Sequence, residues 1–197
     1  ALVNIPTQVL ARSLYRATDL EALFGFHHNP PYPSPRPLWD LGASIKGARF
    51  TPCGGPRSLY MAEDPATAYE EASQISATVA ARDPTLVNPI PPKVTCSARV
   101  HLETVLDLTI PSVQDALGTS VAELTGSWRL VQDRGQIPPT QLLGQTVFSS
   151  GQIQAIRYPS AVSSGHTCIV IFTERLKAPA FVEIFDPFGN LKGRIPP

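Results

Sequence analysis

Proline constrains this chain more than any other feature, because 21 of its 197 residues are proline, against a base rate of about 5%. The prolines crowd residues 29–37 and residues 84–92. Since proline lacks a backbone N–H, neither stretch can form a regular helix or a central strand. We therefore expect rather short helices and strands, joined by long loops that offer many places to build a site.

The proline-rich stretch 29–37 has two interpretations. A polyproline segment could bind an SH3-like partner, whereas a rigid surface loop needs no partner. The surface loop is the simpler expectation.

Length and composition favour one folded domain over residues 1–197. Hydrophobic residues make up 43% of the chain and charged residues 16%, which argues against disorder. The 16 basic and 16 acidic residues balance, so we expect no direct binding to nucleic acid. No stretch approaches the roughly 20 apolar residues that span a bilayer, and a signal-peptide pattern is missing. We expect a cytoplasmic protein without membrane contact.

Familiar metal and nucleotide motifs do not occur. The three cysteines (53, 96 and 168) and the four histidines (27, 28, 101 and 166) show no metal-ligand spacing, so we expect no metal. An odd number of cysteines also fits a reducing compartment. P-loop, G-x-G-x-x-G, H-E-x-x-H and G-x-S-x-G patterns are missing too.

Periodicity and turn signals predict an α+β domain. Strands are expected at 48–50, 58–61, 94–102, 105–109, 155–158, 167–172 and 181–185, and helices at 65–81, 112–117, 120–124 and 139–149. Residues 9–16 read as a short helix running into a strand, 48–61 as a hairpin, and 186–190 as a turn. Because strands and helices do not alternate regularly, we expect a mixed sheet in a single domain.

The helix at 65–81 distinguishes two neighbouring acids. Asp64 is the expected N-cap, and Pro65 suits the first helical position. Ala68, Ala72, Ile75 and Val79 follow the spacing of one buried face. At about 100° per residue, Glu71 lies roughly 70° from the centre of that face and Glu70 roughly 170° from it. We expect Glu71 at the rim of the core and Glu70 in solvent.

Three segments, in this order, resemble a known family. They are Gly-Ala-Arg-Phe-Thr-Pro at 47–52, Tyr60 followed by Asp-Pro-Ala-Thr-Ala-Tyr-Glu-Glu at 64–71, and Arg-Tyr-Pro-Ser-Ala at 157–161. Together they are similar to the RES domain, named for an Arg, a Glu and a Ser that fall here on Arg49, Glu71 and Ser160. The resemblance is strongest over 15–172. The family usually has Gly-Gly-Arg-Trp-Asn around the arginine, and Thr51 cannot reproduce the two donors of an Asn amide.

The resemblance implies a fold similar to the ADP-ribosyltransferases and an enzyme that consumes NAD⁺ as its substrate. Family members act as toxins of toxin–antitoxin pairs and break the nicotinamide–ribose bond by hydrolysis or phosphorolysis, or they ADP-ribosylate a protein. The resemblance also implies an antitoxin partner, often with an Xre-like DNA-binding domain, that covers the cleft. A noncatalytic binding module that uses the proline-rich loop is the alternative from another class.

The residue types suit that chemistry. A carboxylate, Glu71, can stabilise the oxocarbenium-like state of ribose, and guanidinium groups, Arg49 and Arg16, can bind the pyrophosphate. Tyr60 can stack on nicotinamide or bond the ribose, and Ser160 can bond the ribose or a phosphate.

Structural roles are the alternatives for the same residues. Arg49 and Glu71 could form an internal ion pair, Tyr60 could belong to the core, and Ser160 could be a turn residue. Trp39, Trp128 and Tyr158 we assign to packing.

Overall fold

A mixed sheet of seven strands organises the part of the chain that this computed structural model describes, residues 5–25, 31–82 and 91–196, with the backbone alone over 75–82. The strands are β1 (Thr7–Asp19), β2 (Ser58–Ala62), β3 (Lys93–Asp107), β4 (Ala155–Pro159), β5 (Thr167–Phe172), β6 (Phe181–Phe185) and β7 (Arg194–Ile195). They follow the order β1-β2-β5-β4-β3-β6-β7. The β3–β4 pair is parallel, and the other pairs are antiparallel.

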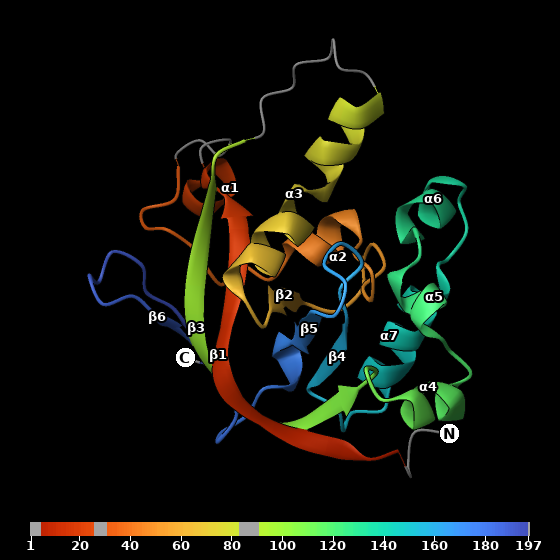
Figure 1. Cartoon of the computed structure of the whole chain (residues 1–197). Helices are drawn as coiled ribbons and strands as arrows, with labels where there is room; N and C mark the ends of the chain where they lie inside the picture. Colours follow the sequence, from red (N-terminus) through yellow and green to blue (C-terminus); the bar gives the residue numbers. More distant parts are fainter. Residues whose placement is uncertain (1–4, 26–30, 83–90, 197) are drawn as a thin grey trace.

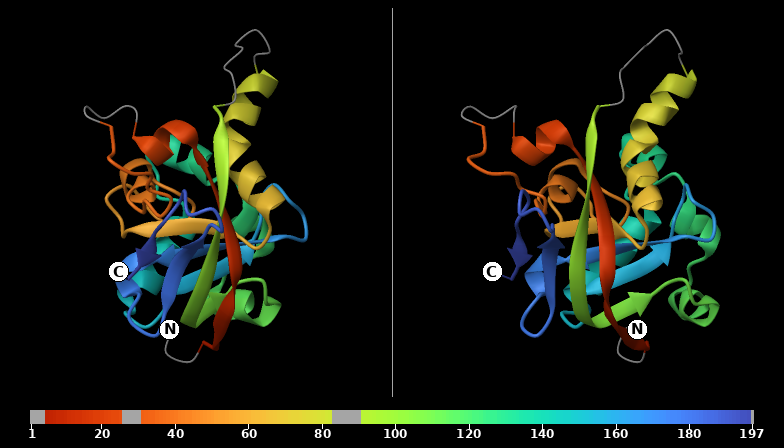
Figure 2. Two further views of the ribbon diagram at one scale, coloured as in Figure 1. Left: turned by 90° about the vertical axis from the view of Figure 1, so that its left-hand side faces the viewer. Right: turned by 60° about the vertical axis from the view of Figure 1, so that its left-hand side comes forward.

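The two longest strands close the sheet on itself. β1 pairs with β3 from Thr7↔Leu106 to Asp19↔Lys93 and also pairs with β2 at Tyr15↔Ala62. Figures 1 and 2 show β1 and β3 running side by side along one flank of the molecule. This ladder places β1 where three of its residues line the candidate site described below.

The sheet has a hydrophobic core on each face. Successive side chains of a strand point to opposite faces, so Ile169 and Ile171 of β5 belong to one core while Val170 and Phe172 belong to the other. The second core is covered by helices, and Phe172 is fully buried in it. Truncating such a phenylalanine to alanine costs about 3–5 kcal/mol.

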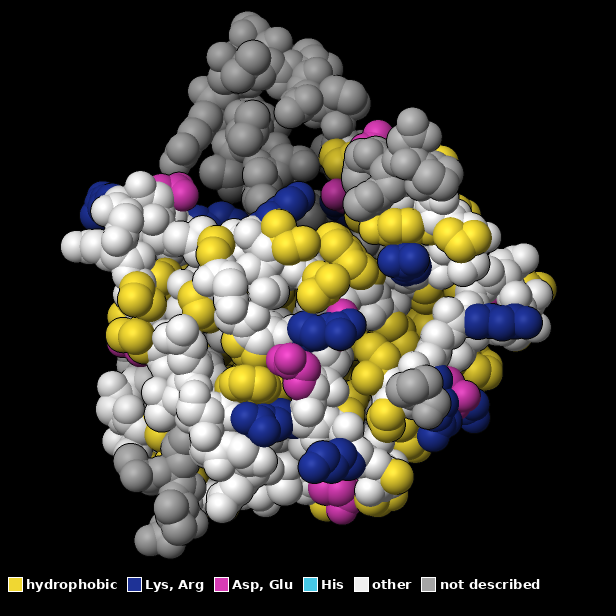
Figure 3. Space-filling model, turned by 180° about the vertical axis from the view of Figure 1, so that it is seen from behind, with side chains coloured by type: hydrophobic (Ala, Val, Ile, Leu, Met, Phe, Trp, Pro, Cys, Tyr) yellow, Lys and Arg dark blue, Asp and Glu magenta, His cyan; other side chains and the backbone are white. Residues whose placement is uncertain are grey.

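The helices are α1 (Leu20–Phe24), α2 (Gly42–Lys46), α3 (Pro65–Arg82), α4 (Pro111–Leu117), α5 (Val121–Thr125), α6 (Trp128–Asp133) and α7 (Pro139–Ser149), with a 3₁₀ turn at Thr173–Arg175. Helices α4 to α7 gather on one side of the sheet, and α3 crosses above it (Figure 1). Within the described residues, no helix is both long enough and apolar enough to cross a lipid bilayer. On the face seen in Figure 3, basic and acidic side chains are intermingled among apolar ones.

Many predicted elements are confirmed. The mixed α+β architecture, strands β4, β5 and β6, and helices α3, α4, α5 and α7 lie where they were expected. Asp64 caps α3, because its Oδ1 accepts the Thr67 N–H at 2.8 Å. The turn after β6 is closed by the Gly189 N–H, which donates to the Asp186 carbonyl at 3.1 Å.

Three predictions about the strands are wrong. Residues 9–16 contain no helix and lie wholly in β1, and the strands expected at 94–102 and 105–109 are one strand, β3. The hairpin expected at 48–61 does not form either: residues 48–51 make a turn with a single bridge, Ala48↔Thr51, and β2 pairs with β5 and β1. In each case pairing with a distant strand overrides the local signal.

The proline-rich stretches lie partly outside the described residues, at 26–30 and 83–90. Residues 31–37 contain neither helix nor strand, as the prolines predict. His27 and His28 also fall outside the described residues.

Candidate active site

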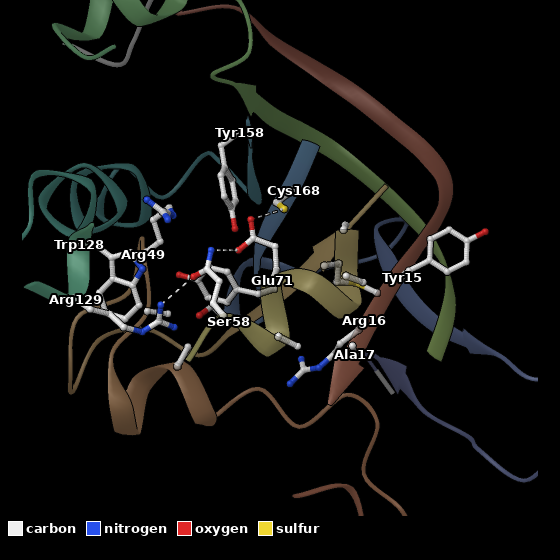
Figure 4. Close-up of a pocket in the computed structure, with 18 residues that line it drawn as sticks. Tyr15, Arg16, Ala17, Arg49, Ser58, Glu71, Trp128, Arg129, Tyr158 and Cys168 are labelled. Atoms are coloured by element: carbon white, nitrogen blue, oxygen red, sulfur yellow. Dashed lines mark hydrogen bonds between the residues drawn. The ribbon is translucent and has the colours of Figure 1, made fainter. Parts of the chain in front are cut away.

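A cavity of about 220 Å³ lies between the sheet, α3 and α6 (Figure 4). Its walls come from β1 and β2, from the 48–49 turn, from α3 and α6, and from single residues of α2, β4 and β5. Four of the five residues assigned to the site from the sequence line it: Arg16, Arg49, Tyr60 and Glu71. The fifth, Ser160, lies behind the wall.

Glu71 presents its carboxylate to the cavity from α3, and the chain holds both of its oxygens. Oε1 accepts the Ser160 hydroxyl at 2.7 Å and the Ala161 N–H at 3.1 Å, with the Cys168 thiol at 3.7 Å. Oε2 accepts an N–H of the Gln74 amide at 3.3 Å. A carboxylate held from both sides keeps its orientation in the cavity.

Glu70 differs from Glu71 as the helix phase predicted. It is exposed, is not part of the cavity wall, and bonds the Ser163 hydroxyl. The apolar face is only partly as expected: Ala68 is buried, but Ala72 is exposed and lines the cavity. The side chains of Ile75 and Val79 lie outside the described residues.

Ser160 supports Glu71. Its side chain is 6% exposed and its hydroxyl donates to Glu71. The same oxygen accepts the N–H groups of Val162 at 3.2 Å and Ser163 at 3.1 Å. A serine hydroxyl has a single hydrogen to donate, and here Glu71 accepts it, so Ser160 orients the carboxylate. Ser160 is not among the residues that line the cavity.

Three arginines line the cavity around one carboxylate, Glu71. Arg49 and Arg129 lie on one side of Glu71 and Arg16 lies on the other (Figure 4). Arg16 donates from Nη2 to the Trp39 carbonyl at 2.8 Å, and its buried Nη1 has no hydrogen-bond partner among the described residues. Burial lowers the pKa of Arg16 to about 10, which leaves it cationic at neutral pH.

Arg49 is anchored at the end of a helix. Its Nη1 donates to the carbonyls of Leu124 at 2.7 Å and Gly126 at 2.8 Å, where the last carbonyls of α5 favour a cation. Among the described residues no ion pair joins Arg49 to Glu71, so that alternative is wrong. The Arg49 guanidinium lies at the cavity wall, and no carboxylate of the described part of the chain forms an ion pair with it.

Arg129 was missed by sequence reasoning. It lies on α6, a helix of six residues with no side-chain N-cap, and the family motifs that carry the resemblance contain no residue from this segment. Its Nη1 donates to Gln74 Oε1 at 3.1 Å, and its guanidinium lies 4.4 Å from the centroid of the Trp128 ring. Burial, and then the charge of Arg49, lower the pKa of Arg129.

Tyr60 uses its hydroxyl to hold the 48–51 turn. The hydroxyl oxygen accepts the Phe50 N–H at 2.9 Å and lies 3.0 Å from Thr51 Oγ1, and burial raises the pKa of Tyr60 to about 12. Thr51 is fully buried and also bonds the Ser58 hydroxyl at 2.9 Å. Thr51 therefore secures the turn that carries Arg49, and the Tyr60 ring is the part of that side chain left for a ligand.

Two aromatic residues assigned to packing also line the cavity. Tyr158 is 4% exposed and packs edge-on against Phe50, with ring centroids 4.7 Å apart. Its hydroxyl end points towards the Glu71 carboxylate in Figure 4. Trp128 is 8% exposed. Both side chains pack in the core and face the cavity.

Among the residues with described side chains, no group of three or more His, Cys, Asp and Glu could hold a metal ion. All three cysteines are free thiols. The charged side chains that line the cavity are one carboxylate and three guanidinium groups, with aromatic rings around them.

Comparison with known proteins gives matches of two kinds, to a family model and to solved structures. The family model described as RES domain matches residues 13–187. The fold is similar to a chain in the crystal structure of the M. tuberculosis MbcT–MbcA toxin–antitoxin complex, with 18% sequence identity and a TM-score of 0.61 over 91% of this chain and 84% of that one. A comparison with curated proteins found no match.

Proposed function

Because this chain belongs to the RES domain family, we propose that it cleaves the bond between nicotinamide and ribose in NAD⁺. The observation that carries the proposal is the Glu71 carboxylate, held on both oxygens in the wall of a cavity that three arginines share. This arrangement offers one fixed negative charge for a cationic centre and several positive charges for phosphates.

Glu71 is the group that acts on the ribose in this proposal. When the C–N bond breaks, its electron pair leaves with nicotinamide and the ribose carbon becomes oxocarbenium-like. A carboxylate already oriented by Ser160 and Ala161 stabilises that charge without reorganising. Water or phosphate then adds to the ribose carbon.

The cations and rings of the cavity suit the rest of the substrate. Arg49 and Arg16 can bind pyrophosphate oxygens, since a guanidinium presents paired donors. The ring of Tyr60 can lie against nicotinamide. The cavity is smaller than the roughly 300–1,000 Å³ of many ligand pockets, so the adenosine end would lie across its open mouth.

We further propose that the chain forms a single domain over residues 1–197 and acts in the cytoplasm without a metal, as the toxin of a toxin–antitoxin pair. Its partner would be an antitoxin that covers the cavity, with an Xre-like domain carrying the DNA contacts. The fold shared with a chain of a toxin–antitoxin complex supports this part of the proposal.

Glu71→Gln tests the proposal, with Glu70→Gln as the matched control one residue away. Incubation with NAD⁺ should release nicotinamide, and Glu71→Gln should reduce the rate by at least about 100-fold, the scale of losing one electrostatic stabiliser of a transition state. Glu70→Gln should retain the wild-type rate because Glu70 lies outside the cavity wall. Equal rates for wild type and Glu71→Gln would overturn the assignment.

The same assay identifies the acceptor of the ribosyl group. Release that needs only water indicates hydrolysis, and release that depends on added phosphate indicates phosphorolysis. Transfer of label from NAD⁺ to a protein would indicate ADP-ribosylation. An enzyme that releases no nicotinamide under any of these conditions would favour a binding module.

Expression in cells tests the toxin role. Induction without the antitoxin should lower cellular NAD⁺ before growth stops, and the antitoxin should protect the NAD⁺ pool. Growth arrest with an undisturbed pool would reject NAD⁺ depletion.

A further inference from the structure

The Glu71 carboxylate is connected to Arg129 through one amide. Gln74 stands between them: its Nε2 donates to Glu71 Oε2 at 3.3 Å, and its Oε1 accepts from Arg129 Nη1 at 3.1 Å. Only this orientation of the amide satisfies both neighbours, because a carboxylate solely accepts and a guanidinium solely donates. The three side chains therefore form a chain of hydrogen bonds with one direction.

The two oxygens of Glu71 are held by different parts of the molecule. Oε1 is held by the segment after β4, through Ser160 and Ala161. Oε2 is held within α3 by Gln74, whose own partner lies on α6. A movement of the Arg129 side chain therefore reaches the carboxylate through its second oxygen.

Arg129 is equipped to bind an anion. It lines the cavity, and Nη1 is the nitrogen that bonds Gln74, which leaves Nε and Nη2 without a hydrogen-bond partner among the described residues. The Trp128 ring supports its guanidinium plane. Arg49 lies on the same side of the cavity (Figure 4), and two like charges facing one space repel unless an anion lies between them.

We propose that Arg129 is a specificity-determining residue that binds a phosphate of the substrate and, through Gln74, positions Glu71 for the reaction. This inference rests on the proposed function. When a substrate with a pyrophosphate binds, the contact between its phosphate and Arg129 would also fix the orientation of the Glu71 carboxylate. A nicotinamide riboside, which has no phosphate, would be cleaved without that advantage.

Binding of ADP, a diphosphate that lacks the bond to be cleaved, separates the two roles. Arg129→Gln should weaken ADP binding by roughly 10-fold or more in calorimetry, as expected for a lost charged hydrogen bond. Gln74→Met should leave ADP binding within about twofold, because Arg129 and its charge remain. Arg134→Ala is the matched control, since Arg134 is an exposed arginine at the end of the same helix and lies outside the cavity wall.

Kinetics on two substrates test the connection. With NAD⁺, Arg129→Gln should raise KM and lower kcat, whereas Gln74→Met should lower kcat with little change in KM. The double variant should have a kcat no lower than the worse single variant, because both substitutions break one chain. With nicotinamide riboside, Arg129→Gln should lower kcat/KM by a smaller factor than with NAD⁺, because the positioning of Glu71 is lost but no phosphate contact is.

Several results would overturn the proposal. These are unchanged ADP binding in Arg129→Gln, an unchanged kcat in Gln74→Met, and equal losses on both substrates with ADP binding intact. If Arg129→Gln does not fold, Arg129→Lys takes its place, because it keeps the charge and loses the fork. If the wild type releases no nicotinamide from NAD⁺, the proposed function fails, and the ADP titration alone decides whether Arg129 binds phosphate.

Discussion

The arginine on one face of β4 and the arginines of the cavity on its other face have different hydrogen-bond partners. Arg157 points away from the cavity and gives Nε and Nη2 to the two oxygens of Glu63, at 2.8 and 3.1 Å, and Nη1 to Asp107 at 3.0 Å. Tyr158, on the other face, lines the cavity. The arginines there bond carbonyls and an amide, and the described residues offer them no ion pair.

The difference distinguishes structural cations from cations that await a ligand. Arg157 is surrounded by carboxylates, which raise its pKa further, and it ties β4 to β3 and to the segment between β2 and α3. The arginines that line the cavity have no carboxylate partner among the described residues. Their charge and their remaining N–H donors are therefore available to an anionic ligand. Substitutions at the two groups should therefore affect different measurements.

The largest expected effect follows from Arg157→Met. The substitution leaves Glu63 and Asp107, whose side chains are 18% and 7% exposed, without their main cation. Breaking one partner of a buried ion pair costs about 3–5 kcal/mol, and urea unfolding should show that loss. Arg129→Met should cost no more than about 1 kcal/mol, because one hydrogen bond is lost. Equal losses would remove the distinction between the two groups.

Acid should weaken the Arg157 group next. Burial alone would raise the pKa of Glu63, but hydrogen bonds from Arg157 and Thr167 and the charges of Arg157 and Arg12 lower it from 4.5 to about 2. A depressed carboxylate pKa stabilises the fold fully above the unfolded value, and the contribution disappears as the pH falls from about 4.5 towards 2. Its size is up to about 3 kcal/mol.

Unfolding free energies measured at a series of pH values between neutrality and about pH 2.5 would show this slope. Glu63→Gln should flatten it, leaving the parts that come from Asp107, Asp64 and Asp186, whose pKa values are also lowered. A slope unchanged by Glu63→Gln would show that other groups carry the acid sensitivity.

Arg49→Lys should have an intermediate effect, because it should reduce both the stability of the fold and the binding of NAD⁺. Lysine keeps the charge but cannot reproduce the fork, so the bonds to Leu124 and Gly126 are weakened and stability should fall by about 1–2 kcal/mol. NAD⁺ binding, measured by calorimetry on the inactive Glu71→Gln background, should weaken as well. Loss of stability with unchanged binding would make Arg49 structural, like Arg157.

The smallest effect is expected for Ser160→Ala. It removes the hydroxyl that Glu71 accepts, while the Ala161 N–H still holds the same oxygen. Stability should fall by about 0.5–1.5 kcal/mol, and kcat should fall far less than in Glu71→Gln. Ser163→Ala should leave kcat unchanged, because among the described residues the Ser163 hydroxyl bonds Glu70 and not Glu71. A loss as large as that of Glu71→Gln would mean that Ser160 acts on the substrate itself.

Local signals explain which parts of the fold were predictable. The Asp64 cap and the 3.6-residue period define α3, and the strand-forming residues of β5 and β6 mark them without reference to the rest of the chain. Helices α1, α2 and α6 have only five or six residues and no side-chain N-cap, whereas the equally short α5 begins after Ser120, whose side chain accepts the Glu123 N–H. Without a periodic or a capping signal, a short helix is not marked in the sequence. The β1–β3 ladder joins residues about 90 positions apart, and no short segment records that pairing.

The site was predictable to the same extent. The phase of α3 separates Glu71 from Glu70, because both lie on one regular helix. The motif predicts that the Ser160 hydroxyl bonds the substrate, but in the structure it donates to Glu71. A sequence motif does not show which way a side chain points. Arg129 of α6 lines the cavity together with residues of α3 and bonds Gln74 there, a tertiary contact that its sequence surroundings do not indicate.

The pairing of β2 with β5 also sets when this cavity can exist during synthesis. Tyr60 of β2 lies opposite Val170 of β5, so the ribosome must add roughly 110 further residues before β2 can pair with β5. At about 5–20 residues per second, that delay lasts several seconds or longer. A chain released before β5 therefore lacks part of the cavity wall, because Cys168 of β5 lines the cavity.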